Sequence, residues 1–374
     1  MPSDLAADHS ADPSVPALDL TVSSIELTRV LCDVESVSGN ETPLADAIEA
    51  ALAGAGHLEV IRDGDTIVAR TNLGRAHRVV IAGHIDTVPL NENLPTRFET
   101  LGDVDYLWGR GTVDMKAGVA VQLKLAAELV DTSVDVTWMW YDHEEVNADL
   151  NGLGRLAANR PDLFQGDFAI LGEPSNSQVE GGCNGNVRIE VRTSGKRAHS
   201  ARAWVGENAI HKAAPILDIL AAYTPREVEV EGLVYREGLN AVGISGGIAG
   251  NVIPDECMVH VNYRFAPSRT ASEAVAHLEE LFAGFDITVV DLAEGARPGL
   301  DAPLALKFLE AVGAEPRPKY GWTDVARFSA LGIPAVNYGP GDPLKAHADD
   351  ERVALTQITD CEDALRAWLT APIG

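Results

Sequence analysis

One apolar run that ends in His and Asp constrains this chain more than any other feature of its sequence. Residues 79–82 are apolar and mostly β-branched, Gly83 breaks the run, and His84 and Asp86 follow. A short, bounded run of this kind is typical of a buried strand in a parallel sheet. Because side chains alternate along a strand, His84 and Asp86 are expected to point to the same side. Such a pair suits a metal ligand and its orienting carboxylate, although a single His-x-Asp is more often an ordinary strand end.

Other predicted strands end in the same way. Apolar runs at 134–141 and 168–171 are followed by Asp-His-Glu-Glu at 142–145 and by Gly-Glu-Pro at 172–174. Predicted helices alternate with these strands, which indicates an α/β layered domain. Open α/β sheets bind their ligands just beyond the carboxyl ends of the strands. The polar stretch 90–108 predicts only an irregular connection.

The pattern changes after Gly182. Between residues 187 and 292 the predicted order is strand, helix, strand, strand, helix, strand, which is the βαββαβ order of the ferredoxin-like plan. We therefore expect an α+β domain inserted into the α/β domain. The expected parts are a flexible N-terminal tail (1–22), a first catalytic part (23–180), a lid and dimerisation domain (181–294) and a second catalytic part (295–374).

Composition excludes several classes of partner. The 374 residues carry 29 Lys and Arg against 56 Asp and Glu, a net charge of -27, which argues against nucleic acid and anionic membranes. Four widely spaced cysteines fit free thiols in a reducing compartment. The first residues lack the basic start and apolar centre of a signal peptide, and no run is long enough for a membrane helix. We expect a cytoplasmic protein.

Two imidazoles and three carboxylates share one kind of position. Four of them follow an apolar run and one opens a helix: His84, Asp114, Glu145, Glu173 and His347. This donor set suits two divalent transition metals, with zinc first, and one carboxylate could bridge them. Glu144, next to Glu145, would then be free to act as a general base on a metal-bound water. This arrangement is suited to amide hydrolysis.

Each of these residues also has an ordinary structural explanation. Asp114 could be an N-cap of the helix that follows it. Glu173 could be a turn residue before Pro174, and His347 could be a surface histidine. His143 is expected to lie outside the metal site, although it neighbours the predicted base.

Six blocks, in order along the chain, resemble the metallopeptidase M20 family. They are GHIDTVP (83–89), GRGTVDMKAG (109–118), DHEEV (142–146), LGEPS (171–175), AHSARAWVGENAI (198–210) and KAHADDERV (345–353). The resemblance implies a mixed-sheet, aminopeptidase-like zinc-hydrolase domain with an inserted ferredoxin-like lid. It also implies two zinc ions per subunit, for which Co2+ may substitute, and a homodimer formed through the lid.

The resemblance implies a role for each matching residue. His84 and Glu173 would hold one zinc, Glu145 and His347 the other, and Asp114 would bridge them. Asp86 would orient His84, Glu144 would be the base, and His199 of the lid would reach the partner subunit's site and stabilise an oxyanion. The implied substrate contacts are Asn251, Arg264, Gly321 and Thr323. The sequence YGWTDVARF at 320–328 departs from the family's usual Gly-Gly-Thr form.

The sequences of the blocks are most similar to those of family members that hydrolyse the amide of a small N-succinyl amino acid. The resemblance therefore implies this reaction. Another N-acyl amino acid hydrolase, such as an acetylornithine deacetylase, or a di- or aminopeptidase is the nearest alternative. A binding protein that uses its metals only for structure is a further alternative, but it has no use for a free carboxylate at Glu144.

Overall fold

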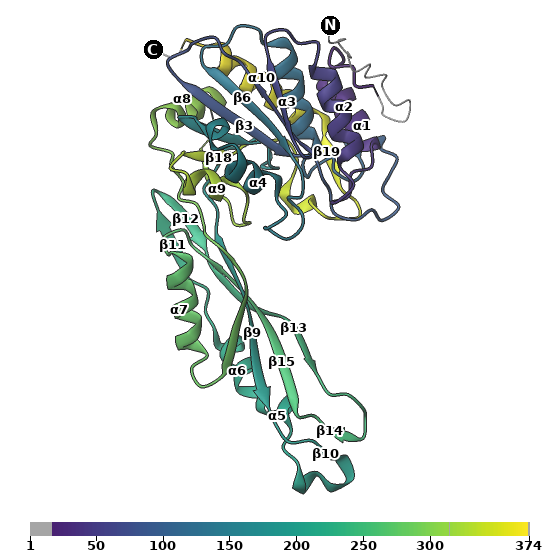
Figure 1. Cartoon of the computed structure of the whole chain (residues 1–374), viewed down its shortest axis with the longest axis vertical. Helices are drawn as coiled ribbons and strands as arrows, with labels where there is room; N and C mark the ends of the chain where they lie inside the picture. The colour runs from purple at the N-terminus through teal and green to yellow at the C-terminus, as the bar shows by residue number, and fades with distance from the viewer. Residues whose placement is uncertain (1–16, 314, 373–374) are drawn as a thin grey trace, which may run out of the picture. The chain divides into compact units, whose positions relative to one another are not determined.

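The computed structural model describes residues 17–313 and 315–372, which divide into two compact units (Figure 1). Unit 1 comprises Met1–Val179, Ala302–Glu315 and Asn337–Gly374, and unit 2 comprises Glu180–Asp301 and Pro316–Val336. Most of the expected tail lies outside the described residues. Leu18 and Leu20 are buried, so packed chain begins before Ser23. Every helix in the described part is too short or too polar to cross a membrane.

A mixed sheet forms the centre of unit 1. The strands of this sheet that lie wholly within unit 1 are, in spatial order, β1 (Glu59–Asp63), β2 (Thr66–Arg70), β6 (Asp135–Tyr141), β3 (Arg78–His84) and β7 (Phe168–Leu171). Strand β3 runs parallel to β6 and β7, and the register places His84 opposite Tyr141 and Ala82 opposite Leu171. The residues that follow β3, β6 and β7 therefore emerge at one edge. This register confirms the α/β prediction and explains why distant polar residues meet.

Helices pack against this sheet. They are α1 (Ser24–Asp33), α2 (Thr42–Leu52), α3 (Lys116–Glu128), α4 (Gly152–Asn159), α8 (Pro303–Val312) and α10 (Leu355–Thr370), with 3-10 turns η1 (Pro161–Phe164) and η3 (Pro343–Lys345). Buried Lys116 ties α3 to α1, because its Nζ donates to the carbonyl oxygens of Leu31 (3.1 Å) and Val34 (2.8 Å). These carbonyls lie at the end of α1, where helix carbonyls lack intrahelical partners.

The stretch expected to be irregular contains a hairpin. Strands β4 (Arg97–Leu101) and β5 (Val104–Trp108) pair, and β19 (Arg352–Ala354) adds a third strand. The turn uses Gly102 at a φ of 63°, a conformation that glycine adopts without strain. Most of β4 and β5 is exposed, so the sequence lacks the apolar run by which buried strands are recognised.

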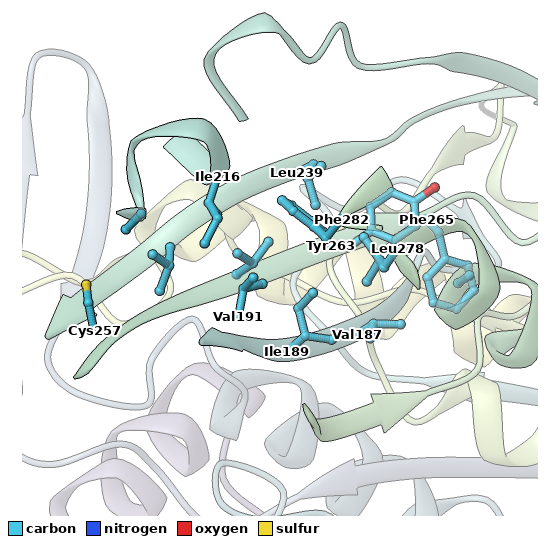
Figure 2. Packing of buried hydrophobic residues seen from close by; sticks show 14 of the residues in the cluster. Val187, Ile189, Val191, Ile216, Leu239, Cys257, Tyr263, Phe265, Leu278 and Phe282 are labelled. Carbon is cyan, nitrogen blue, oxygen red and sulfur yellow. The ribbon is translucent and has the colours of Figure 1, made fainter. Parts of the chain in front are cut away.

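Unit 2 confirms the ferredoxin-like prediction. Its four-stranded sheet has the order β13 (Gly238–Gly246), β15 (Glu256–Phe265), β9 (Gly185–Ser194), β16 (Asp286–Ala293), and all neighbours are antiparallel. Figure 2 shows apolar side chains of this sheet packed with those of α6 (Ala214–Ala222) and α7 (Ala271–Leu281). Alternate residues of β9, Val187, Ile189 and Val191, are buried, as expected for a sheet covered on one face.

Shorter elements complete unit 2. They are β10 (Ala198–His199) with β14 (Val252–Ile253), β11 (Glu227–Val230) with β12 (Leu233–Arg236), β8 (Glu180–Gly181) with β17 (Arg317–Pro318), η2 (Ser200–Val205), α5 (Ala209–Lys212) and α9 (Val325–Ala330); β18 (Ala335–Asn337) spans the boundary. The segment 316–336, which the sequence analysis places in the catalytic domain, groups with unit 2. Pairing of β17 with β8 and a Lys319–Glu180 ion pair (2.9 Å) are the physical reason.

Candidate active site

His84 ends β3 with its ring buried. Its Nδ1 donates to the carbonyl oxygen of Asp86 (3.0 Å) and lies 3.4 Å from the Asp86 carboxylate. Its Nε2 faces Oδ1 of Asp114 at 3.0 Å. Burial alone would lower the pKa of His84, but the Asp114 and Asp86 carboxylates raise it well above its ordinary value. The contact at Nδ1 leaves Nε2 as the nitrogen that can hold a metal ion.

Asp114 lies between two imidazoles. Its Oδ1 faces His84, and its Oδ2 lies 3.3 Å from Nε2 of His347. Met115, not Asp114, is the N-cap residue of α3, and no side-chain cap is made there. Burial alone would raise the pKa of Asp114, but the two imidazoles hold it well below its ordinary value. Asp114 therefore faces two histidines in the way that a bridging carboxylate would.

Glu145 and His347 form the outer side of the cluster. Nε2 of His347 lies 2.9 Å from Oε1 of Glu145. Hydrogen bonds with Asp114 and Glu145 raise the pKa of His347 to about 10. A divalent cation that replaced these hydrogen bonds would release imidazole protons on binding.

Glu173 enters the cluster from the end of β7 and is 5% exposed. The turn before it is packed so closely that a Cβ on Gly118 or on Gly339 would lie 2.2 Å from the carbonyl oxygen of Gly172. Only glycine fits at these two positions, and this packing sets where Glu173 leaves the sheet.

Two overlapping sets of donors share Asp114. One set is His84, Asp114 and Glu173, the other is Asp114, Glu145 and His347, and within each set the donor atoms lie within 4.8 Å of one another. Imidazole nitrogens and carboxylate oxygens are ligands that divalent transition metals accept. The residues therefore fit a metal centre.

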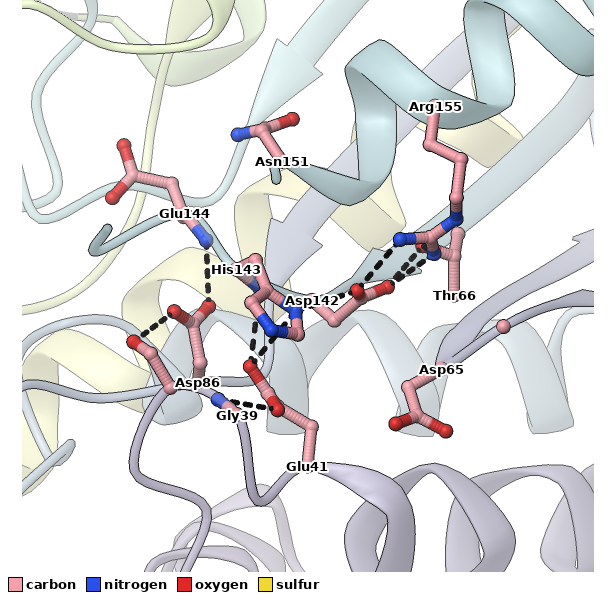
Figure 3. A network of polar contacts seen from close by, with 12 residues as sticks. Gly39, Glu41, Asp65, Thr66, Asp86, Asp142, His143, Glu144, Asn151 and Arg155 are labelled. Carbon is pink, nitrogen blue, oxygen red and sulfur yellow. Dashed lines mark hydrogen bonds and ion pairs between the residues drawn. The ribbon is translucent and has the colours of Figure 1, made fainter. Parts of the chain in front are cut away.

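Asp86 also holds the loop that carries Glu144. Its two carboxylate oxygens accept hydrogen bonds from the backbone N–H groups of Glu144 and Glu145, each at 3.0 Å, and one accepts from Oγ of Ser38 at 2.7 Å (Figure 3). Figure 3 shows the Glu144 carboxylate turned away from Asp86. The Glu144 side chain nevertheless belongs to a third group of neighbouring donors, with His84 and Glu145. A carboxylate in this place can exchange a proton with a nucleophile in the site.

His143 precedes Glu144 in this loop. It has a φ of 59°, and its Nδ1 contacts the carboxylate of Asp142 at 2.8 Å. It belongs to none of the donor groups found among the described residues. The contacts of its imidazole with Asp142 and Glu41 help to hold the loop in place.

The predicted substrate contacts lie in unit 2 and are not all together. His199 on β10 pairs with Val252, and the N–H of Ser200 donates to the carbonyl oxygen of Asn251 (2.9 Å), so His199 and Asn251 are neighbours. Arg264 lies near the far end of β15. The eight residue steps from Glu256 to Arg264 span about 26 Å of strand.

The remaining predicted contacts lie in the segment after β17. Gly321 is exposed and Thr323 is buried. Nε1 of the intervening Trp322 donates to the carbonyl oxygen of Glu294 (3.0 Å). The Arg264 side chain has no hydrogen bond or ion pair with any described residue, whereas the side chain of its neighbour Arg188 binds Asp291.

A buried carboxylate that was not predicted from the sequence, Glu351, supports Asp114. Oε1 of Glu351 accepts from the N–H groups of Val113 (2.9 Å) and Asp114 (3.1 Å), and Oε2 accepts from the Arg110 guanidinium (2.8 Å). Glu351 is 1% exposed and lies four residues after His347. Glu351 and Arg110 both lie inside the quoted blocks. Their supporting role was missed because their burial becomes visible only in the folded structure.

Comparison with known proteins agrees with this description. The profile of "Peptidase family M20/M25/M40" matches residues 80–371, and the chain belongs to this family of metallopeptidases. It is 51% identical over 355 residues to the "Putative succinyl-diaminopimelate desuccinylase DapE" of Mycobacterium tuberculosis, covering 94% of this chain and 99% of that protein. It is 47% identical over 366 residues to the succinyl-diaminopimelate desuccinylase of Corynebacterium glutamicum, covering 95% and 98%.

The fold is similar to that of solved structures. A tripeptidase from Staphylococcus aureus superposes with a TM-score of 0.74 at 19% identity and covers 95% of this chain and 98% of that one. This likeness concerns the fold; the family model and the relatives at 47% and 51% identity confirm the predicted resemblance to the M20 family.

Proposed function

We propose that this chain hydrolyses N-succinyl-LL-2,6-diaminopimelate to succinate and LL-2,6-diaminopimelate, a step of lysine and diaminopimelate biosynthesis. One arrangement carries the proposal: a carboxylate, Asp114, with an imidazole at each oxygen and a further carboxylate beside each imidazole. The names of the relatives at 47% and 51% identity support the succinyl substrate. Four buried free thiols support a location in the cytoplasm. The net charge of -27 argues against nucleic acid as a partner and so favours a small-molecule substrate.

Two zinc ions would complete the site. His84, Asp114 and Glu173 would hold one, and Asp114, Glu145 and His347 the other. When bound, they supply Lewis acidity toward the amide carbonyl and a water of lowered pKa. Glu144 accepts the proton of the attacking water at its carboxylate and donates it to the leaving nitrogen as the C–N bond breaks. Asp86 holds both the His84 ring and the backbone of Glu144 in place for this transfer.

Unit 2 would bind the substrate. The Arg264 guanidinium, which has no partner among the described residues, suits a carboxylate of the substrate. His199 and Asn251 lie at the opposite end of the sheet of unit 2, so one chain does not offer all three groups at one place. A homodimer in which a second copy supplies His199 to stabilise the oxyanion removes this difficulty.

Chelation and a substrate panel test the proposal. We expect the metal-free enzyme to be inactive, and zinc or cobalt to restore turnover with two equivalents bound per chain, measured by elemental analysis. N-succinyl-LL-2,6-diaminopimelate should be turned over faster than N-acetylornithine or a dipeptide in parallel assays. Activity without metal would contradict the metal mechanism, and a preference for the dipeptide would identify a peptidase.

Mixing two inactive variants tests the supply of His199 by a second copy. His199→Ala and Glu144→Gln are each expected to lose activity alone. In a randomly mixed dimer population, about a quarter of the sites combine an intact Glu144 with an intact His199 from the other copy, so activity should return to about that level. Formation of mixed dimers is checked by native mass spectrometry. Mixed dimers without activity would show that His199 of one copy does not act at the site of the other.

A further inference from the structure

Two buried carboxylates hold three successive backbone N–H groups of the loop that carries Glu144. The N–H of His143 donates to Oε1 of Glu41 (3.2 Å), and those of Glu144 and Glu145 donate to Asp86 (3.0 Å each). Figure 3 shows Glu41 and Asp86 side by side below this loop. Buried N–H groups need acceptors, so the path of the loop depends on both carboxylates.

The Glu41 side chain does not serve its own helix. It stands at the N-cap position of α2 but makes no side-chain cap there. Its side chain is 0% exposed, and its second oxygen accepts from the N–H of Gly39 (2.8 Å). The buried carboxylate is therefore directed away from its helix and toward the loop after β6.

The backbone at His143 makes this acceptor important. A φ of 59° is uncommon for a residue with a bulky side chain and persists only where surrounding contacts maintain it. Glu41 lies 3.4 Å from Nδ1 of the His143 ring and also accepts from its backbone N–H, and the Asp142 carboxylate contacts the same ring nitrogen at 2.8 Å. Asp142 is fixed in turn by Arg155 and Thr66.

We propose that Glu41 is a positioning residue for Glu144. It belongs to none of the donor groups found among the described residues, and it acts by fixing the backbone one residue before the base. This inference rests on the proposed role of Glu144 as proton acceptor. It assigns a function to the loop between α1 and α2, which lies outside all six family-like blocks.

Glu41→Gln is the direct test. The amide has one oxygen and one NH2 group, so either the Gly39 or the His143 N–H loses its acceptor. We expect kcat to fall about 10- to 100-fold, as for small misplacements of a reacting group, with KM and bound metal unchanged. Glu41→Asp keeps the charge but is one methylene shorter, and it should show a smaller loss; it also serves if Glu41→Gln does not fold.

Asp135→Asn is the matched control. Asp135 is a buried carboxylate at the opposite end of β6, and it accepts from the N–H groups of Leu73 (2.7 Å) and Arg75 (2.9 Å). The Asp135→Asn substitution should lower the melting temperature as Glu41→Gln does but leave kcat unchanged. A wild-type kcat in Glu41→Gln, or an equal loss in Asp135→Asn, would overturn the inference.

Hydrogen exchange separates this inference from the proposed reaction. Amides of residues 142–145 should exchange at least about 10-fold faster in Glu41→Gln than in the wild type or in Asp135→Asn, whatever substrate the enzyme prefers. Unchanged exchange would refute the positioning role. Wild-type enzyme that turns over none of the panel would instead refute the proposed function.

Discussion

Glu144→Gln is expected to lower kcat by about 10²- to 10⁴-fold, the range that a positioned acid or base contributes. The amide has nearly the same shape but cannot accept the proton of the attacking water. The backbone N–H of Glu144 still donates to Asp86, so the loop keeps its anchor. Bound metal, measured by elemental analysis, and the unfolding midpoint should both stay close to wild type.

Asp149→Asn is the control for this substitution. Asp149 is an exposed carboxylate in the same loop region, so its loss changes the charge by the same amount. It should leave kcat unchanged. An undiminished kcat in Glu144→Gln would remove Glu144 from the mechanism, and loss of one metal equivalent would show that it is a ligand.

Glu351→Ala is expected to have the largest effect on stability. The substitution leaves the buried Arg110 guanidinium without its carboxylate and the N–H groups of Val113 and Asp114 without their acceptor. Breaking a buried ion pair from one side costs about 3–5 kcal/mol. Urea unfolding of the metal-free protein should show this loss, and zinc titration should show weaker binding because the loop of Asp114 is no longer held.

Two comparisons make this test specific. Removing both charges, as in Arg110→Met with Glu351→Met, should restore part of the stability, since no charge then remains buried alone. Asp162→Ala, which removes an exposed ion pair with Arg160, should leave the unfolding midpoint near wild type. A Glu351→Ala protein as stable as wild type would contradict the inferred role.

The three central strands of unit 1 were predicted correctly because they are buried. The runs at 79–82 and 168–171 are apolar throughout and the run that ends at Tyr141 is mostly apolar; the structure contains them as β3, β7 and β6. The hairpin of β4 and β5 was missed because its exposed residues carry no such pattern.

The candidate ligands were found because each belongs to a local pattern. His84, Glu145 and Glu173 follow predicted strands, which made them candidates, and the family-like blocks assigned them as ligands. Parallel pairing of β3 with β6 and β7 then brings them to one edge. Their assignment to two metal ions stays a prediction for the metal titration.

Local sequence patterns were enough to place the buried strands and the main helices and to single out the polar side chains that follow the strands, because these features depend on neighbours within a few residues. Which carboxylate faces which imidazole, and what supports each of them, follows only from the three-dimensional fold. Glu41 lies 102 residues from His143, and Glu351 lies 238 residues from Val113. Contacts over such separations arise from strand register and loop packing, which no local pattern encodes.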